Sequence, residues 1–447
     1  MRTPRISRIV FCLLLAWGLP ALSATEQEAA GFVREGRFDQ AAEAFQALVN
    51  QNPRSVRLRI ELADNLARDR QWDRALAEYE RVLKLEPNNV EALKGIGSVN
   101  RWRGHIAEAR KAYRSARAAA PNDPGAVLEF AVTETQDHDF SAARALYDEA
   151  GRRWPQDPEV KQATYDFNRL ANPRVYAYFE NDLSFQTRMG GAAAPFSARE
   201  EIGYERQQEL RYSYLTGDKI YQRDDNKLLY THFFGFNHTL EIGLRNSKFS
   251  YEVPPVDFTA IDTFDEYRVR YAVPVTPEQV VGVRYTARPT TLVGGQTFVS
   301  QKIEPELISQ WEPRFQTQLG VGWLRDLDPN ATAVDQLTDR TLVRAGFQYI
   351  VNNRLDISAR YVTNPDLDST IDSTLIAEAN YGLSPDGYSL LVRGRHDSYK
   401  TGDDQSSAYA GIRYTPTSNL WSEAGIKYVV RGPSSGFFPL VSVIWRF

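Results

Sequence analysis

The sequence predicts a two-part α + β protein, with an N-terminal α-helical solenoid followed by a C-terminal antiparallel transmembrane β-barrel. Three observations support this. A basic and then apolar segment opens the chain, a 34-residue period runs through the first part, and apolar and polar side chains alternate after Asn172-Pro173. We therefore expect a signal peptide at 1–24, a repeat domain at 25–172 and a barrel at 173–447.

The first segment has the parts of a secretory signal peptide. Arg2, Arg5 and Arg8 precede an apolar run from Ile9 to Leu19, and a zone rich in small residues follows it. The alternative is a membrane-anchoring helix, but this run is roughly half of the ~20 residues needed to span a bilayer. Cys12 is the only cysteine and would leave with the signal, so the mature chain suits an oxidising compartment.

The repeat domain is predicted from four columns of residues with a step of 34. The columns are Phe38, Trp72, Ile106 and Phe140; Ala41, Ala75, Ala109 and Ala143; Phe45, Tyr79, Tyr113 and Tyr147; and Pro53, Pro87, Pro121 and Pro155. A period of this length resembles the tetratricopeptide repeat, which implies two amphipathic helices per unit.

These columns are predicted to be packing positions. The alanines let helices approach closely, the aromatic residues fill gaps between units, and the prolines stop the second helix. The segment 162–170 is expected to form a capping helix. Candidates for partner contact on the concave face are Asn65, Arg68, Asn100, Arg101 and Arg103, although a solvated helix face is the better explanation for any single one of them.

The second part alternates with a period of two, as in Tyr267, Val269 and Tyr271 against Arg268 and Arg270. A sandwich core could show the same pattern. From residue 274 onward, however, short connections alternate with longer polar ones, which is typical of a transmembrane barrel with tight periplasmic turns and long outer loops. The aromatic content of 12% also favours a β-rich protein.

The strand count predicted from the segments is about 14, within a range of 12 to 16. The stretch Ile220–Asn237 has no place in a 14-strand count, because one extra strand would make the number odd. It is expected to be either a periplasmic insertion or part of an additional hairpin, which would give 16.

The last strand places Val441, Val443, Trp445 and Phe447 on one apolar face. A terminal aromatic with apolar residues at every second place resembles the signal that the outer-membrane barrel-assembly machinery reads. We expect that machinery and the outer-membrane lipid bilayer to be partners of this chain.

If the apolar face meets lipid, a basic set of side chains lines the lumen, opposed by Glu266, Glu378 and Glu423. The lumen candidates are Arg268, Arg270, Arg284, Arg344, Arg360, Arg393, Arg395, Arg413 and Lys427. They are expected either to form internal ion pairs or to give a conduit a positive potential for anionic cargo. Histidines are scattered without ligand spacing, so we expect no enzyme activity, cofactor or metal. The net charge of -4 argues against nucleic-acid binding.

A signal peptide, repeats and a C-terminal barrel in one chain resemble the exopolysaccharide export porins of the poly-N-acetylglucosamine and cellulose type. This resemblance implies a periplasmic repeat domain that binds a periplasmic protein partner, and an outer-membrane barrel that passes polysaccharide cargo. The surface lipoprotein assembly modifiers, which carry a short repeat domain, and the YaiO-type outer-membrane proteins are also similar. Polymer conduit and lipoprotein translocator both stay open at this point.

Overall fold

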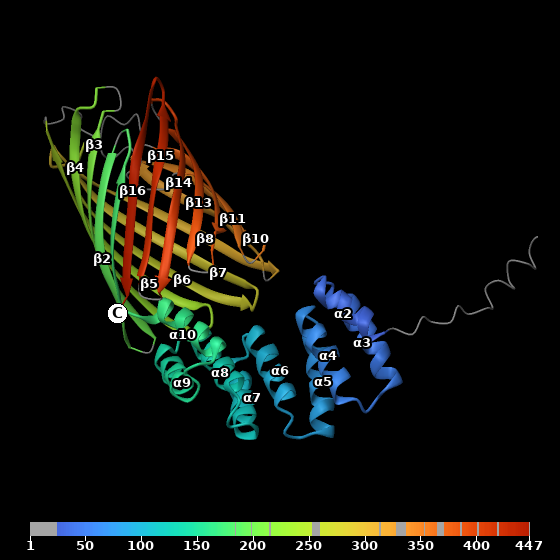
Figure 1. Ribbon diagram of the computed structural model, residues 1–447. Helices are drawn as coiled ribbons and strands as arrows, with labels where there is room; N and C mark the ends of the chain where they lie inside the picture. Colours follow the sequence, from blue (N-terminus) through green and yellow to red (C-terminus); the bar gives the residue numbers. More distant parts are fainter. Residues whose placement is uncertain are drawn as a thin grey trace, which may run out of the picture. The chain divides into compact units, whose positions relative to one another are not determined.

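The computed structural model describes residues 25–447 apart from short gaps (Figure 1). The gaps are residues 184, 198, 214–215, 253–259, 313, 328–336, 353, 364–370, 385–386, 400–401, 418–419 and 447. The expected signal peptide, the terminal Phe447 and parts of the expected outer loops therefore lie outside the described residues. The chain divides into two compact units, one ending at Thr133 and the other beginning at Glu134.

The helices follow the 34-residue period closely. They are α2 (Glu26–Arg34), α3 (Phe38–Gln51), α4 (Val56–Arg68), α5 (Trp72–Leu85), α6 (Val90–Trp102), α7 (Ile106–Ala119), α8 (Pro124–Gln136), α9 (Phe140–Arg153) and α10 (Pro158–Ala171). The boundary between the two units falls within α8. Phe38, Trp72, Ile106 and Phe140 are the first residues of α3, α5, α7 and α9, and a proline follows each of these helices after one intervening residue. The repeat columns thus mark where the second helix of each unit begins and ends.

The turn inside each repeat uses the left-handed backbone conformation. Gly36, Arg70, Gly104 and His138 are spaced by 34 residues and have φ angles of 74°, 60°, 75° and 57°. A residue at this position ends the first helix and turns the chain into the second. Two repeats carry glycine there, and two carry a side chain in a conformation that costs free energy.

The alanine and aromatic columns form the helix contacts. Ala41, Ala75, Ala109 and Ala143 are each 0% exposed, and Phe45, Tyr79, Tyr113 and Tyr147 are between 0% and 4% exposed. The hydroxyl of Tyr79 donates to Asp64, and the hydroxyl of Tyr113 lies 2.9 Å from Ser98 Oγ, at the equivalent place in the next repeat. Burial raises the pKa of Asp64 above its ordinary range.

Sixteen antiparallel strands close into a barrel in the described part of the second unit (Figure 1). They are β1 (Arg174–Asn181), β2 (Phe185–Ser197), β3 (Glu200–Tyr212), β4 (Lys219–Gly235), β5 (His238–Tyr251), β6 (Ile261–Thr276), β7 (Gln279–Leu292), β8 (Thr297–Glu312), β9 (Phe315–Leu327), β10 (Leu337–Ile350), β11 (Leu355–Thr363), β12 (Ile371–Gly382), β13 (Tyr388–Tyr399), β14 (Gln405–Thr417), β15 (Leu420–Arg431) and β16 (Ser434–Arg446). Each strand pairs with the next along the chain, and β16 pairs with β1.

The two-part fold is confirmed. The described strands number 16 rather than about 14, which is the upper end of the expected range and the count given by the additional-hairpin alternative. The stretch Ile220–Asn237 is strand β4 and its turn, not a periplasmic insertion. The second missed strand is β2, whose run Met189–Pro195 consists largely of glycine and alanine. Such residues have low β-propensity, so pairing with β1 and β3 makes this strand, and its own composition does not reveal it.

Apolar side chains of the strands are exposed on the outer wall. Tyr267, Val269 and Tyr271 of β6 are 49%, 41% and 41% exposed, while Phe264 and Glu266 of the same strand are buried. The terminal strand repeats this: Val441, Val443 and Trp445 are 44%, 37% and 48% exposed, and Leu440 is buried. A continuous apolar outer face of this kind is typical of a barrel that lies in lipid.

Three helical segments belong to the same unit as the barrel, namely the end of α8, α9 and α10. Within that unit, Arg199 donates to Asp137 at 2.5 Å, and the ring of His138 stacks on Phe233 with centroids 4.3 Å apart. The turn between α8 and α9 therefore contacts the ends of strands β2 to β4. None of the described helices has the length and apolar character needed to cross a membrane.

Candidate functional site: the inner wall of the barrel

Charged side chains on the inner wall form cross-strand networks, and nearly all of the lumen candidates take part in them. The alternation of each strand sends one set of side chains outward and the other inward, so a charge on one strand meets inward charges on its neighbours. The networks fall into three groups along the wall, which follow one another around the sheet.

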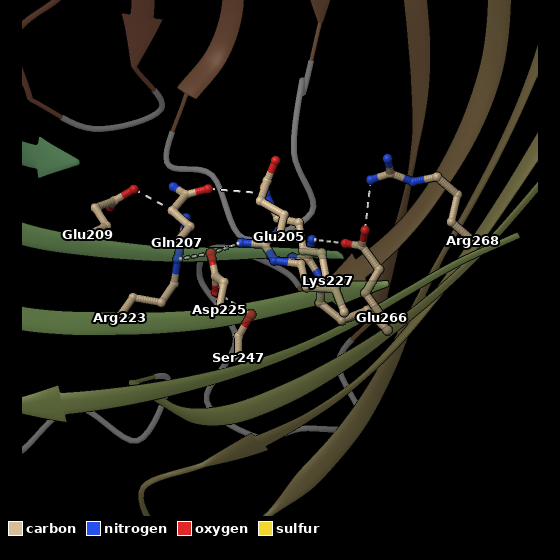
Figure 2. Close-up of polar contacts among 11 residues, drawn as sticks. Glu205, Gln207, Glu209, Arg223, Asp225, Lys227, Ser247, Glu266 and Arg268 are labelled. Atoms are coloured by element: carbon tan, nitrogen blue, oxygen red, sulfur yellow. Dashed lines mark hydrogen bonds and ion pairs between the residues drawn. The ribbon is translucent and has the colours of Figure 1, made fainter. Parts of the chain in front are cut away.

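The first network is centred on Asp225 of β4 (Figure 2). This carboxylate is 1% exposed and accepts from Arg223, from Arg245 at 2.8 Å and from the hydroxyl of Ser247 at 2.5 Å. Arg223 also reaches Glu209 of β3 at 3.2 Å. A carboxylate this deeply buried is stable only with such partners, so the network holds β3, β4 and β5 in register.

A recess of about 540 Å³ opens beside this network. Lys227 Nζ lies 2.6 Å from Glu205 and 3.1 Å from Gln207, and the hydroxyl of Tyr176 donates to Glu205 (Figure 2). At its other side, Arg268 donates to Glu266 at 2.7 Å. The recess is lined by leucines as well as by these charged groups, and the charged groups named here are paired with one another.

The second network links β5 to β10. Arg270 lies between two acids, with Glu241 and Glu306 each 2.6 Å away. Glu304 is shared in the same manner. It accepts from Arg344 at 3.0 Å and lies 3.3 Å from Lys302 and 3.7 Å from Arg284.

The third network runs from β12 to β1 across the closure of the barrel. It joins Arg393 to Glu378 at 2.7 Å, Arg395 to Asp397 at 2.7 Å, Arg413 to Glu423 at 3.1 Å, and Lys427 to Asp182 at 3.0 Å and to Glu180. These pairs connect both ends of the barrel sequence. Their first role is therefore to fix the closed sheet.

Arg360 of β11 differs from the other lumen candidates. Among the described residues, no ion pair or hydrogen bond is recorded for its side chain, and the residue is exposed. The charged groups that act on it are three arginines and one acid, namely Arg344, Arg395, Arg393 and Glu378. Each of the other eight lumen candidates is paired with an acid, so Arg360 is the one candidate without a recorded partner among the described residues.

Several acids of the inner wall were missed from the sequence. Glu180, Glu205, Glu241, Glu304 and Glu306 each pair with a cation of the inner wall. The alternation of inward and outward residues along β5 and β8 is enough to assign Glu241, Glu304 and Glu306 to the inner wall. Glu205 faces Lys227 of β4, and the alternation of residues in β3 alone does not place a partner on a neighbouring strand.

The candidates for partner contact on the repeats are largely internal. Asn65, Asn100 and Arg101 are 2%, 7% and 8% exposed, so these three are not available on a surface. The two amides donate to backbone carbonyls of their own helices, and Arg101 pairs with Glu129 at 2.9 Å. Arg103 pairs with Asp73, and Arg68 lies over the ring of Phe38.

Comparison with known families matches the helical region. Residues 27–90 and 60–124 match one tetratricopeptide-repeat model, and residues 103–164 match another. In sequence, the chain is 28% identical over 116 residues to DnaJ homolog subfamily C member 3 of Gallus gallus. That match covers 25% of this chain and 23% of the relative, so the chain spans less than a quarter of that protein.

Three of the similar solved structures each cover about a third of the chain. MamA 41-end from Desulfovibrio magneticus RS-1 is 20% identical, with 32% of this chain and 80% of that chain covered and a TM-score of 0.28. Pseudomonas aeruginosa pilF is 18% identical, with 32% and 64% covered and a TM-score of 0.28. TTC0263, a tetratricopeptide-repeat protein of Thermus thermophilus, is 16% identical, with 32% and 78% covered and a TM-score of 0.29.

Proposed function

We propose that this protein is an outer-membrane conduit that exports, or assists the secretion of, an extracellular polysaccharide. The observation that carries the proposal is the size and polarity of the barrel. The sheet closes with sixteen strands in the described part of the chain, and barrels of about 16 to 18 strands leave an aqueous channel. The charged inner wall suits a hydrated, polar cargo, and the apolar outer wall suits lipid.

The repeats give the conduit a docking domain. Tetratricopeptide repeats generally mediate contacts between proteins, and stacked repeats offer an extended surface for one partner. In the proposed arrangement this domain lies in the periplasm and recruits a periplasmic protein to the inner mouth of the barrel. No enzymatic step is assigned to this chain, because the proposed role is binding and passage.

A second candidate function is translocation of surface lipoproteins. The array of only four repeat columns favours it, because a short repeat domain beside a barrel resembles the lipoprotein assembly modifiers more than the long-array exporters. A role of the YaiO type is the third resemblance. A gene for a lipoprotein beside this one would favour translocation, and neighbouring genes for a glycosyltransferase and a deacetylase would favour polysaccharide export.

Conductance of the purified full-length protein in planar bilayers tests the conduit. We expect stepwise ionic current with a preference for anions, because Arg360 lacks a recorded partner among the described residues whereas the other lumen candidates are paired with acids. A barrel that inserts in its folded, heat-modifiable form but passes no current would contradict the conduit and favour the translocator.

Four arginines give a matched test of how selectivity arises. Arg268, Arg270, Arg393 and Arg395 each lie against a carboxylate, so changing all four to Gln removes four positive charges and keeps the acids, of which Glu266 still has Arg288 as a partner. We expect the reversal potential to move toward cation selectivity. A cation-selective wild-type pore would contradict the expectation that the positive side chains of the inner wall make the channel prefer anions.

A further inference from the structure

One stretch of the inner wall carries uncharged polar side chains in place of ion pairs. Gln316 of β9 faces Gln348 of β10 in the strand register, and Gln348 faces Ser358 of β11. These three residues, here called the amide row, line a recess of about 310 Å³. Ser358 in turn faces Glu378 of β12, so the row ends at a carboxylate.

The next row along the wall places Arg360 beside open space. Gly346 lies between Gln318 and Arg360 in the register, and it has no side chain to fill the recess. At this point the wall of the recess is the backbone of Gly346, between the side chains of Gln318 and Arg360. Gln318 donates to Glu306 at 2.9 Å, so it is held in place by the neighbouring network.

Arg360 also belongs to a second recess, of about 260 Å³, that continues toward β1. The two recesses share Arg360, Ile376 and Glu378. Gln405 lines the second recess, is 4% exposed and leaves its Oε1 atom without a hydrogen bond among the described residues. Two adjoining recesses therefore contain the cation Arg360, the neutral polar groups of the amide row and the buried acceptor Gln405 Oε1.

We propose that Arg360 and the amide row form a binding station for a carboxylate-bearing sugar unit of a glycan. This inference rests on the proposed conduit and names the class of its cargo. The guanidinium of Arg360 would take the carboxylate through two parallel hydrogen bonds, the geometry that arginine provides for planar anions. The two glutamine amides and the hydroxyl of Ser358 would bond to ring hydroxyls, for which they supply both donors and acceptors.

The chemistry of the wall favours this ligand over a neutral sugar or a small inorganic anion. A neutral glycan would leave Arg360 unpaired among three other arginines. A small anion would meet the cation but not the amide row. Glu378 ends the row and is already paired with Arg393, so Arg360 is the group in this space that lacks an anionic partner among the described residues.

Calorimetric binding to the full-length protein in detergent tests the station directly, with hexagalacturonate as the acidic probe and cellohexaose as the neutral one. We expect hexagalacturonate to bind more tightly. Arg360→Gln is expected to weaken that binding about tenfold or more, the loss typical of a hydrogen bond to a charged group. Gln348→Ala should weaken it less, and it should leave binding of acetate unchanged.

Arg268→Gln is the matched control. It removes the same charge from an exposed arginine of the same wall, but Arg268 is paired with Glu266 and lies outside both recesses of the station. Equal loss in Arg268→Gln and Arg360→Gln would overturn the station and leave only a general effect of lumen charge. Equal binding of the two glycans by the wild type would overturn it as well.

Folding and conduction are measured separately so that the two proposals can be told apart. Heat-modifiable migration reports whether each variant is a folded barrel, and Arg360→Lys replaces Arg360→Gln if the latter does not fold. Lys keeps the charge but loses the bidentate geometry, so we expect a partial loss of hexagalacturonate binding. Selective binding of hexagalacturonate without any conductance would contradict the conduit and support the station. Conductance without selective binding would support the conduit and contradict the station.

Discussion

The ring of Tyr113 occupies the space in which a side chain at Gly97 would begin. A Cβ atom on Gly97 would lie 2.6 Å from Cζ of that ring, and Tyr113 itself is 0% exposed. The aromatic column of one repeat therefore depends on a glycine in the preceding helix, α6. Gly95, also in α6, leaves the same kind of space for the ring of Tyr79, which belongs to the helix before it, α5.

The first prediction concerns this pair. Gly97→Ala should lower the free energy of unfolding of the repeat fragment 25–172, which we expect to be soluble, by about 1–3 kcal/mol, as overpacked cores do. Tyr113→Ala should lower it by about 3–5 kcal/mol, as truncation of a large buried side chain does. Urea denaturation followed by circular dichroism measures both.

The control for this pair is Gly151→Ala in α9. Nothing lies within 4 Å of a Cβ at Gly151, so the substitution should stabilise the helix by about 0.5–1 kcal/mol through its better helix propensity. A loss of stability in Gly151→Ala equal to that in Gly97→Ala would show that packing against Tyr113 is not the cause.

The second prediction concerns the left-handed turns. Arg70→Gly should stabilise the same fragment by about 1 kcal/mol, because glycine adopts the φ of 60° at no steric cost. Gly104→Arg makes the reverse change at the equivalent turn of the next repeat, where φ is 75°. We expect opposite shifts of the urea midpoint for the two variants, and shifts of the same sign would refute the argument.

The third prediction is a pH dependence that arises from Asp64. Burial raises its pKa in the folded state, so the folded protein takes up a proton before the unfolded chain does as the pH falls. Asp64 therefore lowers stability at neutral pH, and this cost disappears as the pH falls through the raised pKa toward the ordinary value. Asp64→Asn should be more stable than the wild type at pH 7 and lose this dependence, while Tyr79 can still donate to the amide oxygen.

Comparing the two proteins isolates Asp64 from other carboxylates. The free energy of unfolding of wild type and variant is measured between neutral pH and about pH 4, the range in which a raised carboxyl pKa acts. The difference between the curves should shrink on acidification. If the wild type instead lost stability relative to Asp64→Asn as the pH falls, the ionised carboxylate would be stabilising the repeat.

The fourth prediction tests which face of the barrel meets lipid. Ile426 of β15 is 59% exposed on the outer wall, and the adjacent Lys427 is 6% exposed and paired with two inner acids. The double variant Ile426→Lys with Lys427→Ile keeps the composition and reverses the faces. A lysine at the lipid midplane costs about 2–4 kcal/mol, and the two acids lose their partner, so we expect loss of the heat-modifiable barrel.

The matched control is the conservative pair Ile426→Leu with Lys427→Arg, which keeps apolar and cationic side chains on their faces. It should assemble in outer-membrane fractions at the yield of the wild type. If the reversed variant assembled equally well, the outer wall at β15 would not face lipid.

The periodic features of this protein can be recognised from short stretches of its sequence. Trp72 and Ile106 begin helices, and a proline follows the end of each of these helices. Alternate residues of β16 form its apolar outer face. Each of these features depends on residues only a few positions apart. A step of 34 residues or of two residues can be read without knowing what lies beside it in space. The repeat domain and the barrel class could therefore be predicted together with the outward side chains of the regular strands.

The pairing of the inner charges was decided by the tertiary structure alone. Lys427 and Asp182 are 245 residues apart, and they meet at 3.0 Å only because β16 closes the barrel against β1. The same closure required β2, whose Gly- and Ala-rich composition does not mark it as a strand, and β4, which fits an even strand count only once β2 is present. Local sequence determines which way a side chain faces, whereas the partner it meets depends on strand order and register, which the whole closed sheet sets at once.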